Sequence, residues 1–400
     1  MRRLLFLTES FYPTLGGGER HTQGLAEALS LQGFSCTVLT RRSSLDLPES
    51  ETLGGVRVLR VPPPGPARTG KYRMILPSIG ALFRERGSHD GIVVRGTRLL
   101  GLPAVLTARA LGKRVVLQPE LNGEFTGDVY TFGTALDRGL PKALVRGGTR
   151  LRNGLLLDAD RIVAMSRAIR DEAVQAGVEP HRVALIPHGV DTDLFRPSSK
   201  EEASALRGRL GLPQEGVLVA YSGRLLRGKG LEVLLEAFAR VGATDPKAHL
   251  LILGSGEGQA LSVEPTLQAL SEGPGLHGRV TFAGRRENVS DYLRAADLFA
   301  FPSLYEALGI ALIEAQACGL PAVGSRTGGI VDVIEDGKTG LLVPPGDALA
   351  LGEALRALVS DPERRLALGL RARERARASF GAGESLARYR ELFLELGARP

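Results

Sequence analysis

Short apolar segments alternate with longer amphipathic segments along nearly the whole of this 400-residue sequence. The first pair is the clearest. The apolar segment Leu4–Leu7 precedes a glycine-rich loop and then Glu19–Leu31, in which apolar residues recur at helical spacing. Apolar strands that alternate with amphipathic helices are typical of βα units, and such units build parallel sheets. The sequence therefore predicts an α/β fold.

The alternation is interrupted once, between Pro187 and Leu212, and restarts at the apolar segment Val217–Tyr221. A chain of this length suits two domains of moderate size. Ligands of Rossmann-like sheets bind at the carboxyl ends of the strands, so we expect a deep cleft between two such domains to hold the ligand. The expected divisions are residues 1–190, residues 191–380 and a final helical segment in residues 381–400.

The composition indicates a folded protein without a membrane span. Hydrophobic residues make up 43% and charged residues 24% of the chain, and no apolar stretch reaches the ~18 residues that a span requires. The first apolar run is too short for a secretion signal and meets Glu9 at once. Cys36 and Cys318 lie far apart in apolar surroundings, so we expect two buried, reduced thiols in a cytoplasmic protein.

Basic residues are concentrated in one region of the sequence. The net charge is +7, but Pro63–Arg152 alone carries 15 Lys and Arg against 6 Asp and Glu. Solvated arginines on helix faces are one interpretation of this excess. The other is attraction of an anionic partner, and Lys71–Arg86 and Arg138–Arg152 would then face an anionic or lipid-linked acceptor, with the protein peripheral to a membrane. We expect no nucleic acid partner, because aromatics are only 5% and no RNA-recognition motif is present.

Three glycines, Gly16 to Gly18, separate the first expected strand from the first expected helix. Glycines at such a place let the backbone approach a substrate closely and leave free amides at a helix start. The segment does not follow the Gly-x-Gly-x-x-Gly pattern of nicotinamide cofactor sites, because Glu19, Arg20 and His21 follow it. A plain tight turn is the alternative interpretation.

The segment Ser222–Gly230 follows the first strand of the second half and carries Arg224 and Lys229 five positions apart. Fixed cations beside a helix start suit a diphosphate, and they would stabilise negative charge as a phosphate leaves. The spacing does not match a Walker loop, which makes an ATPase improbable on motif grounds. An ordinary exposed basic loop is the alternative.

The segment Pro302–Glu314 is the most informative. Glu306 follows an apolar strand, and Glu314 lies eight residues further on in an otherwise apolar helix, a rise of ~12 Å. This length spans the distance from a ribose across a diphosphate to an attached sugar, with the amides near Gly309 and Ile310 facing the phosphates. A carboxylate in an apolar helix needs a partner, and sugar hydroxyls are suitable partners for both glutamates. An arginine partner for Glu314 is the alternative.

Together these segments resemble the GT-B glycosyltransferases of family GT4, and the resemblance covers nearly the whole chain. Any one match is weak alone, but their order and spacing make chance agreement improbable. The matching positions include Pro13, Gly17–Gly18, Gly33, Ala164–Ser166, Ile186–Asp191, Gly223–Arg224, Lys229–Gly230, Ala296–Asp297, Pro302–Ser303, Glu306, Gly309, Glu314–Ala315 and Gly328–Gly329.

The resemblance implies a retaining glycosyltransferase that needs no metal ion or other cofactor. Arg224 and Lys229 would bind the donor diphosphate and, with Glu306 at the donor sugar, form the catalytic set. Glu314 would hold the ribose hydroxyls and the loop at Arg285 would lie near the base. The remaining donor contacts would be Gly17, Gly18, Gly309 and Ile310, and the last helix, Ser385–Leu396, would cross back to the first domain.

The sequence departs from this family in the loop after Val115–Leu117. Many relatives have a histidine there, whereas this loop reads Gln118-Pro-Glu-Leu-Asn-Gly-Glu-Phe125. We expect Glu120, Asn122 or Glu124 to meet the sugar or the acceptor instead, together with His188.

The resemblance leaves the substrates open. The donor would be a UDP- or GDP-sugar that carries a hexose, and the acceptor a hydroxyl of a glycan, a lipid-linked compound or a small molecule. A nucleotide-sugar epimerase of the same fold is one alternative, although epimerases lack the Arg-Lys loop combined with two glutamates. A non-catalytic basic protein that binds membranes or nucleic acid is the other, and it gives no reason for the placement of Glu306 and Glu314.

Overall fold

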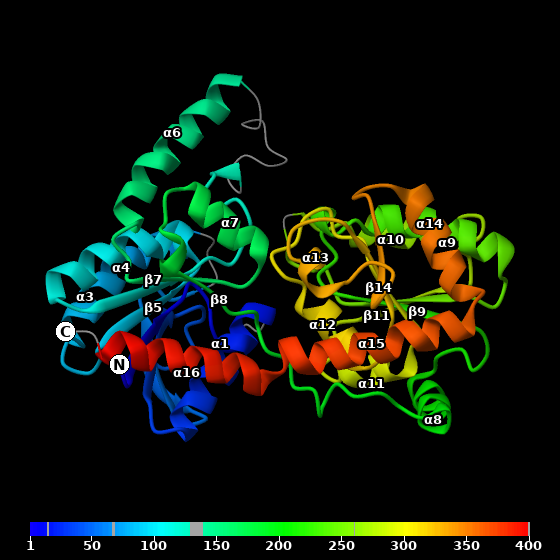
Figure 1. Cartoon of the computed structure of the whole chain (residues 1–400), viewed down its shortest axis with the longest axis horizontal. Helices are drawn as coiled ribbons and strands as arrows, with labels where there is room; N and C mark the ends of the chain where they lie inside the picture. Colours follow the sequence, from blue (N-terminus) through cyan, green and yellow to red (C-terminus); the bar gives the residue numbers. More distant parts are fainter. Residues whose placement is uncertain (14–15, 66–68, 129–138, 260, 399–400) are drawn as a thin grey trace. The chain divides into compact units, whose positions relative to one another are not determined.

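The structure is a computed structural model that describes residues 1–13, 16–65, 69–128, 139–259 and 261–398 (Figure 1). Contacts divide the chain into two compact units, which we call unit 1 (Met1–His188 with Ser385–Pro400) and unit 2 (Gly189–Glu384). Both are α/β units, so the predicted fold class is confirmed. Arg68 and Arg138 of the basic region lie outside the described residues.

Unit 1 is built on an eight-stranded sheet with the order β3-β4-β2-β1-β5-β6-β7-β8. All neighbouring strands are parallel except β3 and β4, which pair antiparallel. The strands are β1 (Arg3–Leu7), β2 (Ser35–Arg41), β3 (Ser50–Leu53), β4 (Val56–Val61), β5 (Gly91–Arg95), β6 (Arg114–Gln118), β7 (Arg161–Ala164) and β8 (Val183–Leu185).

Helices cover both faces of this sheet, which is why its central strands read as continuous apolar runs. Successive residues of β1 serve opposite faces: Leu5 packs with α3 and α4, and Phe6 packs with α1 and α16. The helices of unit 1 are α1 (Gly17–Leu31), α2 (Gly70–Arg73), α3 (Ile75–Arg84), α4 (Thr97–Leu111), α6 (Gly139–Leu156), α7 (Arg167–Gln175) and α16 (Ala382–Ala398).

The final helix, α16, completes the core of unit 1 although it follows unit 2 in the sequence. Tyr389 and Phe393 are fully buried and belong to the same apolar cluster as β1 and α1. The amino group of Met1 donates a hydrogen bond of 2.6 Å to the carbonyl of Phe393, and Arg161 of β7 forms an ion pair of 2.8 Å with Glu395. The two ends of the chain are therefore tied into one unit.

The edge of the unit 1 sheet differs from the expected all-parallel pattern. Gly54 and Gly55, both with positive φ, form a two-residue turn between β3 and β4, as is typical of tight hairpins. The antiparallel strand β3 was not expected because its sequence, Ser-Glu-Thr-Leu, is mostly polar.

Unit 2 is built on a six-stranded, all-parallel sheet with the order β11-β10-β9-β12-β13-β14. The strands are β9 (Leu218–Ser222), β10 (His249–Leu253), β11 (Val280–Gly284), β12 (Leu298–Phe301), β13 (Ala322–Ser325) and β14 (Gly340–Val343). The helices are α8 (Lys200–Leu210), α9 (Leu231–Thr244), α10 (Glu264–Ser271), α11 (Val289–Ala295), α12 (Ile310–Ala317), α13 (Ile330–Val333), α14 (Ala348–Val359) and α15 (Pro362–Phe380).

Two further sequence expectations concern buried and apolar segments. Cys36 and Cys318 are both buried as free thiols, and burial raises their pKa to about 11 and about 12, respectively. Across the described ranges, none of the helices combines the length and the apolar character of a membrane span.

The contribution of α16 is testable by truncating its central side chain. Phe393→Ala should lower the free energy of unfolding by about 3–5 kcal/mol, because the variant leaves a cavity in the unit 1 core. Arg390→Ala, on the exposed side of the same helix, is the control and should change it by about 0.5 kcal/mol or less. Guanidinium denaturation followed by circular dichroism measures both, and equal losses would contradict this packing.

Candidate functional site

The candidate donor residues of unit 2 follow two neighbouring parallel strands. Strands β9 and β12 pair in register, Val219 with Leu298 and Ala220 with Phe299. The loop with Arg224 and Lys229 leaves β9, and the loop with Glu306 leaves β12. Because parallel neighbours end at the same edge of a sheet, the fold brings these two loops together.

An ion pair joins the two loops. Lys229 Nζ lies 2.6 Å from Glu306 Oε2, and the two side chains are only 21% and 15% exposed. The second carboxylate oxygen of Glu306 accepts a 3.3 Å hydrogen bond from the amide of Ala307, and Ser303 Oγ lies 3.5 Å from Oε2. The carboxylate of Glu306 is therefore held in one position at the sheet edge.

Glycines make the close approach of these loops possible. The amide of Leu304 donates a 3.0 Å hydrogen bond to the carbonyl of Gly228, and a Cβ atom at Gly228 would meet the hydroxyl of Tyr305. Gly230 has a φ of +66°, and a Cβ atom there would collide with the carbonyl of Pro302. A side chain at Gly230 would therefore force the two loops apart, whereas one at Gly228 would displace the exposed ring of Tyr305.

Arg224 lies in the same loop as Lys229, after β9, and is exposed. The buried hydroxyl of Tyr221 donates a 3.2 Å hydrogen bond to the backbone carbonyl of Arg224. Burial raises the pKa of Tyr221, the charge of Glu306 raises it further, and the charge of Arg224 lowers it. Both charges therefore act on one buried hydroxyl.

Helix α12 begins directly after this carboxylate. Gly309, with a φ of +95°, precedes the first helical residue, Ile310, and the carbonyl of Glu306 accepts a 2.9 Å hydrogen bond from Gly329. Glu314 is half-buried one turn into the helix. The expected ~12 Å helical rise from Glu306 to Glu314 is wrong, because α12 begins only at Ile310. Burial raises the pKa of Cys318, and the charge of Glu314 raises it further. Arg285 is exposed directly after β11. In the sheet, β10 lies between β11 and β9.

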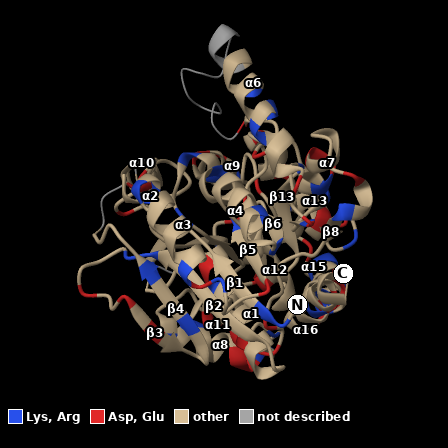
Figure 2. Cartoon of the chain, turned by 90° about the vertical axis from the view of Figure 1, so that its left-hand side faces the viewer, with Lys and Arg blue, Asp and Glu red and all other residues tan. Residues whose placement is uncertain are grey.

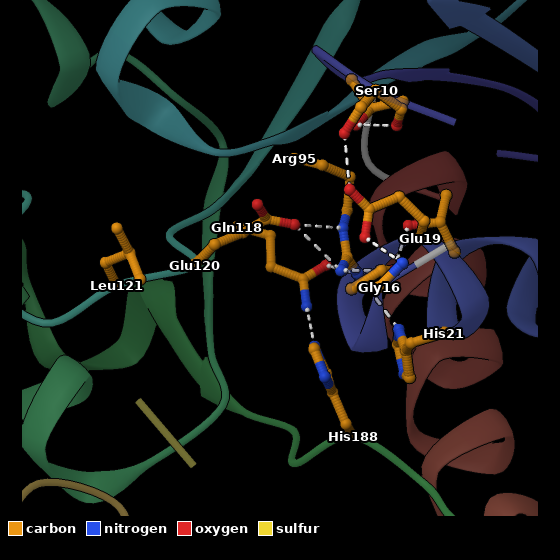
Figure 3. Close-up of polar contacts among 12 residues, drawn as sticks. Ser10, Gly16, Glu19, His21, Arg95, Gln118, Glu120, Leu121 and His188 are labelled. Carbon is orange, nitrogen blue, oxygen red and sulfur yellow. Dashed lines mark hydrogen bonds and ion pairs between the residues drawn. The ribbon is translucent and has the colours of Figure 1, made fainter. Parts of the chain in front are cut away.

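In unit 1, Gly17 and Gly18 are the first two residues of α1. The side chain of Glu19 holds the preceding turn, because its carboxylate accepts hydrogen bonds from the amide of Gly16 (3.0 Å) and the hydroxyl of Ser10 (2.5 Å) (Figure 3). The glycines are thus placed at the carboxyl end of β1 by a side chain of their own helix.

A buried arginine, Arg95, organises this edge of unit 1, and sequence reasoning missed it. Arg95 ends β5, is 1% exposed, and donates to Gln118 Oε1 (3.0 Å) and to the carbonyl of Gly18 (3.2 Å) (Figure 3). It also forms a 3.1 Å ion pair with Glu120 and lies 3.1 Å from His21 Nδ1. A buried guanidinium requires such partners, so Arg95 fixes the glycine turn and Glu120 together.

His188 is placed inside this network. Its ring stacks on that of His21 at a centroid distance of 3.8 Å, and its Nε2 lies 3.2 Å from the amide nitrogen of Gln118. Burial lowers the pKa of both histidines well below the usual value, with the charge of Arg95 adding to the effect. His188 is 3% exposed, so its expected contact with a sugar or an acceptor stays a prediction.

The loop after β6 is held by two carboxylates. Glu124 is buried and accepts hydrogen bonds from the amides of Thr97, Glu120 and Leu121, and Glu172 accepts from the amides of three residues of the same loop. Glu124 therefore stabilises the conformation of the loop. The side chain of Glu120 remains 39% exposed, burial raises its pKa, and Asn122 is half-buried beside it.

Across the described ranges, His, Cys, Asp and Glu form no group of three or more that could hold a metal ion. The cationic and acidic side chains at the two sheet edges are instead suited to bind phosphate oxygens and hydroxyl groups directly.

Comparison with known proteins identifies relatives of both units. Residues 15–194 match the family described as Glycosyltransferase Family 4, and residues 203–375 match the glycosyl transferases group 1. D-inositol 3-phosphate glycosyltransferase 1 of Catenulispora acidiphila is 32% identical over 93% of this chain and 89% of its own length. The D-inositol 3-phosphate glycosyltransferase of Xylanimonas cellulosilytica is 31% identical over 96% and 93%.

Solved structures give the same result for the fold. Sucrose-phosphate synthase from Thermosynechococcus elongatus superposes with a TM-score of 0.81 at 25% identity, covering 99% of this chain and 100% of the other. HepE of Anabaena, in complex with UDP and glucose, superposes with a TM-score of 0.77 at 20% identity, covering 98% and 99%. These structures confirm the GT-B fold that the sequence predicted.

The role of Gly230 in placing Lys229 is testable with two matched substitutions. Gly230 and Gly258 both have positive φ, but only at Gly230 would a Cβ atom meet backbone; at Gly258 the space is open. Both Gly→Ala variants carry the strain of a left-handed alanine, about 1–2 kcal/mol. Gly230→Ala should lose at least about 1 kcal/mol more in thermal or chemical unfolding, and a smaller or equal loss would show that the contact with Pro302 is unimportant.

Proposed function

Since the chain belongs to the glycosyl transferases group 1, we propose that it transfers a hexose-type sugar from a nucleotide-sugar donor to a hydroxyl group of an acceptor. The observation that carries this proposal is the Lys229–Glu306 ion pair of 2.6 Å at the carboxyl edge of the unit 2 sheet, in a loop that also carries Arg224. Cations and a carboxylate at one edge suit a molecule that joins a diphosphate to a polyhydroxylated ring.

The donor diphosphate binds to Arg224 and Lys229 in this proposal. An ammonium group has three N–H donors, so the bond from Lys229 to Glu306 leaves two for phosphate oxygens. The first amides of α12, near Gly309 and Ile310, add donors at the positive end of the helix dipole. Glu314, about 6 Å further along the helix axis than Ile310, accepts from the ribose hydroxyls.

Glu306 contacts the donor sugar near the reacting carbon. The bond between the anomeric carbon and the phosphate oxygen breaks, and the acceptor oxygen bonds to the same face of that carbon, which retains its configuration. The acceptor proton passes to the departing phosphate oxygen. Arg224 and Lys229 stabilise the negative charge on the leaving nucleoside diphosphate, which is the task that a metal ion performs in other enzymes, so we expect activity in the presence of EDTA.

The comparisons support UDP and a small acceptor among the open choices. HepE, which shares the fold, is described in complex with UDP, with UDP-glucose, and with UDP and glucose, and the sequence relatives are named D-inositol 3-phosphate glycosyltransferases. We therefore propose a UDP-sugar before a GDP-sugar, with Arg285 near the base and Gly17, Gly18 and Glu120 as contacts in unit 1. The names of these relatives also favour transfer over epimerisation.

The exposed side chains of helix α6 support a second proposal, that the protein associates with an anionic lipid surface. It extends outward from the rest of unit 1 and carries basic residues (Figures 1 and 2). Leu144 and Leu151 are 67% and 78% exposed, and Arg146 and Arg150 are exposed on the same helix. Exposed leucines next to arginines are typical of helices that lie in a lipid interface.

The two glutamates of unit 2 should have separable roles. Glu306→Ala should lower kcat by at least 100-fold and change nucleotide affinity by less than threefold, because its contact is with the reacting sugar. Glu314→Ala should weaken UDP binding about tenfold, the value of a lost charged hydrogen bond. Isothermal titration calorimetry with UDP and turnover of UDP-glucose measure the two effects.

The control for both variants is Glu236→Ala, an exposed carboxylate on α9, which should change neither quantity. The assignment of roles is wrong if Glu306→Ala abolishes UDP binding while Glu314→Ala leaves it unchanged. The proposed function as a whole is wrong if calorimetry detects no binding of a nucleoside diphosphate to the protein.

Lipid association is testable by vesicle flotation at low salt. The protein should float with phosphatidylglycerol vesicles and not with phosphatidylcholine vesicles, and Leu151→Ser should halve the floated fraction or reduce it further. Leu366→Ser, which removes a leucine of similar exposure (66%) from unit 2, should have no effect. Equal flotation with both lipids would refute the electrostatic part of this proposal.

A further inference from the structure

Strands β9 and β10 of unit 2 pair parallel and in register, so the loops that follow them leave the same edge of the sheet. We call the loop after β9 the basic loop (Gly223–Gly230) and the loop after β10 the clasp loop (Gly254–Val263). Residue 260 of the clasp loop lies outside the described residues. The ion pair with Glu306 fixes the basic loop at Lys229, and other contacts hold its first half.

Backbone hydrogen bonds join the first half of the basic loop to the clasp loop. The amide of Leu225 donates to the carbonyl of Ser255 (3.3 Å), and the carbonyl of Leu225 accepts from the amide of Val263 (3.0 Å). Leu225 is fully buried and directly follows Arg224, so these bonds fix the backbone from which the arginine projects. The same two loops are also joined by a β-bridge between Leu226 and Ser262 and by a 3.0 Å bond from the amide of Arg227 to the carbonyl of Leu261.

Glu264 ties the two ends of the clasp loop together. It is the half-buried first residue of α10, directly after Val263. One of its oxygens, Oε2, accepts a 2.8 Å hydrogen bond from Ser255 Oγ and a 2.6 Å hydrogen bond from the amide of Gly256. The carboxylate therefore sets the spacing between the two points at which the clasp loop binds Leu225.

The two loops are also packed against each other without spare room. A Cβ atom at Gly256 would lie 2.7 Å from the carbonyl oxygen of Leu225 and would overlap the hydroxyl of Ser262. A Cβ atom at Gly254 would overlap the carbonyl of Gly223. Because backbone meets backbone at both places, a displacement of the clasp loop displaces the basic loop.

We propose that Glu264 is a positioning residue for the donor diphosphate and acts without a contact of its own to that ligand. Glu264 holds the clasp loop, and the clasp loop holds the backbone of Leu225. This backbone sets the place where the guanidinium of Arg224 meets the phosphate oxygens. Charge-assisted hydrogen bonds depend on distance and angle, so a displaced arginine binds the diphosphate less tightly. The inference rests on the proposed function, in which Arg224 binds the donor diphosphate.

The test measures the affinity of the full chain for UDP by isothermal titration calorimetry. Glu264→Ala should weaken UDP binding about tenfold, because the hydrogen bonds that clasp the loop are lost. Glu264→Gln should weaken it less than about threefold, since one amide oxygen can accept both of the bonds that Oε2 accepts. Glu272→Ala, which removes a 70% exposed carboxylate at the other end of α10, is the control and should leave UDP affinity unchanged.

A double-mutant cycle separates positioning from a general loss of stability. In the Arg224→Ala background, Glu264→Ala should weaken UDP binding by less than about twofold, because the group that Glu264 positions is gone. A role confined to the folding of α10 would give the same loss in both backgrounds. Gly256→Ala leaves Glu264 in place but presses on the carbonyl of Leu225. It should weaken UDP binding too, again only when Arg224 is present, and it decides the question if Glu264→Ala does not fold.

Additive losses of UDP affinity in the cycle would overturn this inference and leave the proposed function intact. Equal UDP affinity of the unmodified chain and Glu264→Ala would overturn it as well, as would equal losses in Glu264→Ala and Glu272→Ala. Unchanged UDP affinity in Arg224→Ala would contradict the proposed role of that arginine and this inference with it. Absence of UDP binding to the unmodified chain would instead contradict the proposed function.

Discussion

Strands β9 and β12 of unit 2 run in the same direction and pair side by side, and so do the neighbours β2, β1, β5 and β6 of unit 1. Within each sheet, parallel pairing places the carboxyl ends of these strands at one edge. Residues as distant in sequence as Lys229 and Glu306 meet for this reason. The proposed chemistry depends on this directionality more than on any single contact.

The loops at the edge of unit 1 are held by carboxylates that lie in the loops or in neighbouring helices. Glu19, Glu124 and Glu172 each accept amide hydrogen bonds within the loops of unit 1, and Gly228 and Gly230 let the loops of unit 2 approach closely. Carboxylates used in this way satisfy buried amides, whereas Glu120 and Glu306 remain at the edge. The acidic residues thus divide into those that hold the loops and those that form ion pairs at the sheet edges.

Much of the fold could be predicted from the sequence, because apolar runs such as Ile92–Val94 and Leu250–Leu253 report burial on both faces of a parallel sheet. The polar edge strand β3 could not be predicted, because its sequence has no apolar alternation that would indicate a strand. Glu306 and Lys229 were singled out as candidates from their places after apolar strands, but the ion pair between them was not predicted. Arg95 was not, because a buried arginine at the end of an apolar strand looks like an ordinary surface residue until its partners from distant segments are known.

The packing of α16 has a consequence for the order in which the protein matures. Unit 1 takes Tyr389, Phe393 and Leu396 from the last helix into its core, so this core stays open until the ribosome has passed those codons. Unit 2 has all of its residues earlier. During synthesis all residues of unit 2 are therefore present before those of unit 1, the reverse of the usual N-terminal-first order, and until then the apolar face of β1 and α1 lacks its partner α16.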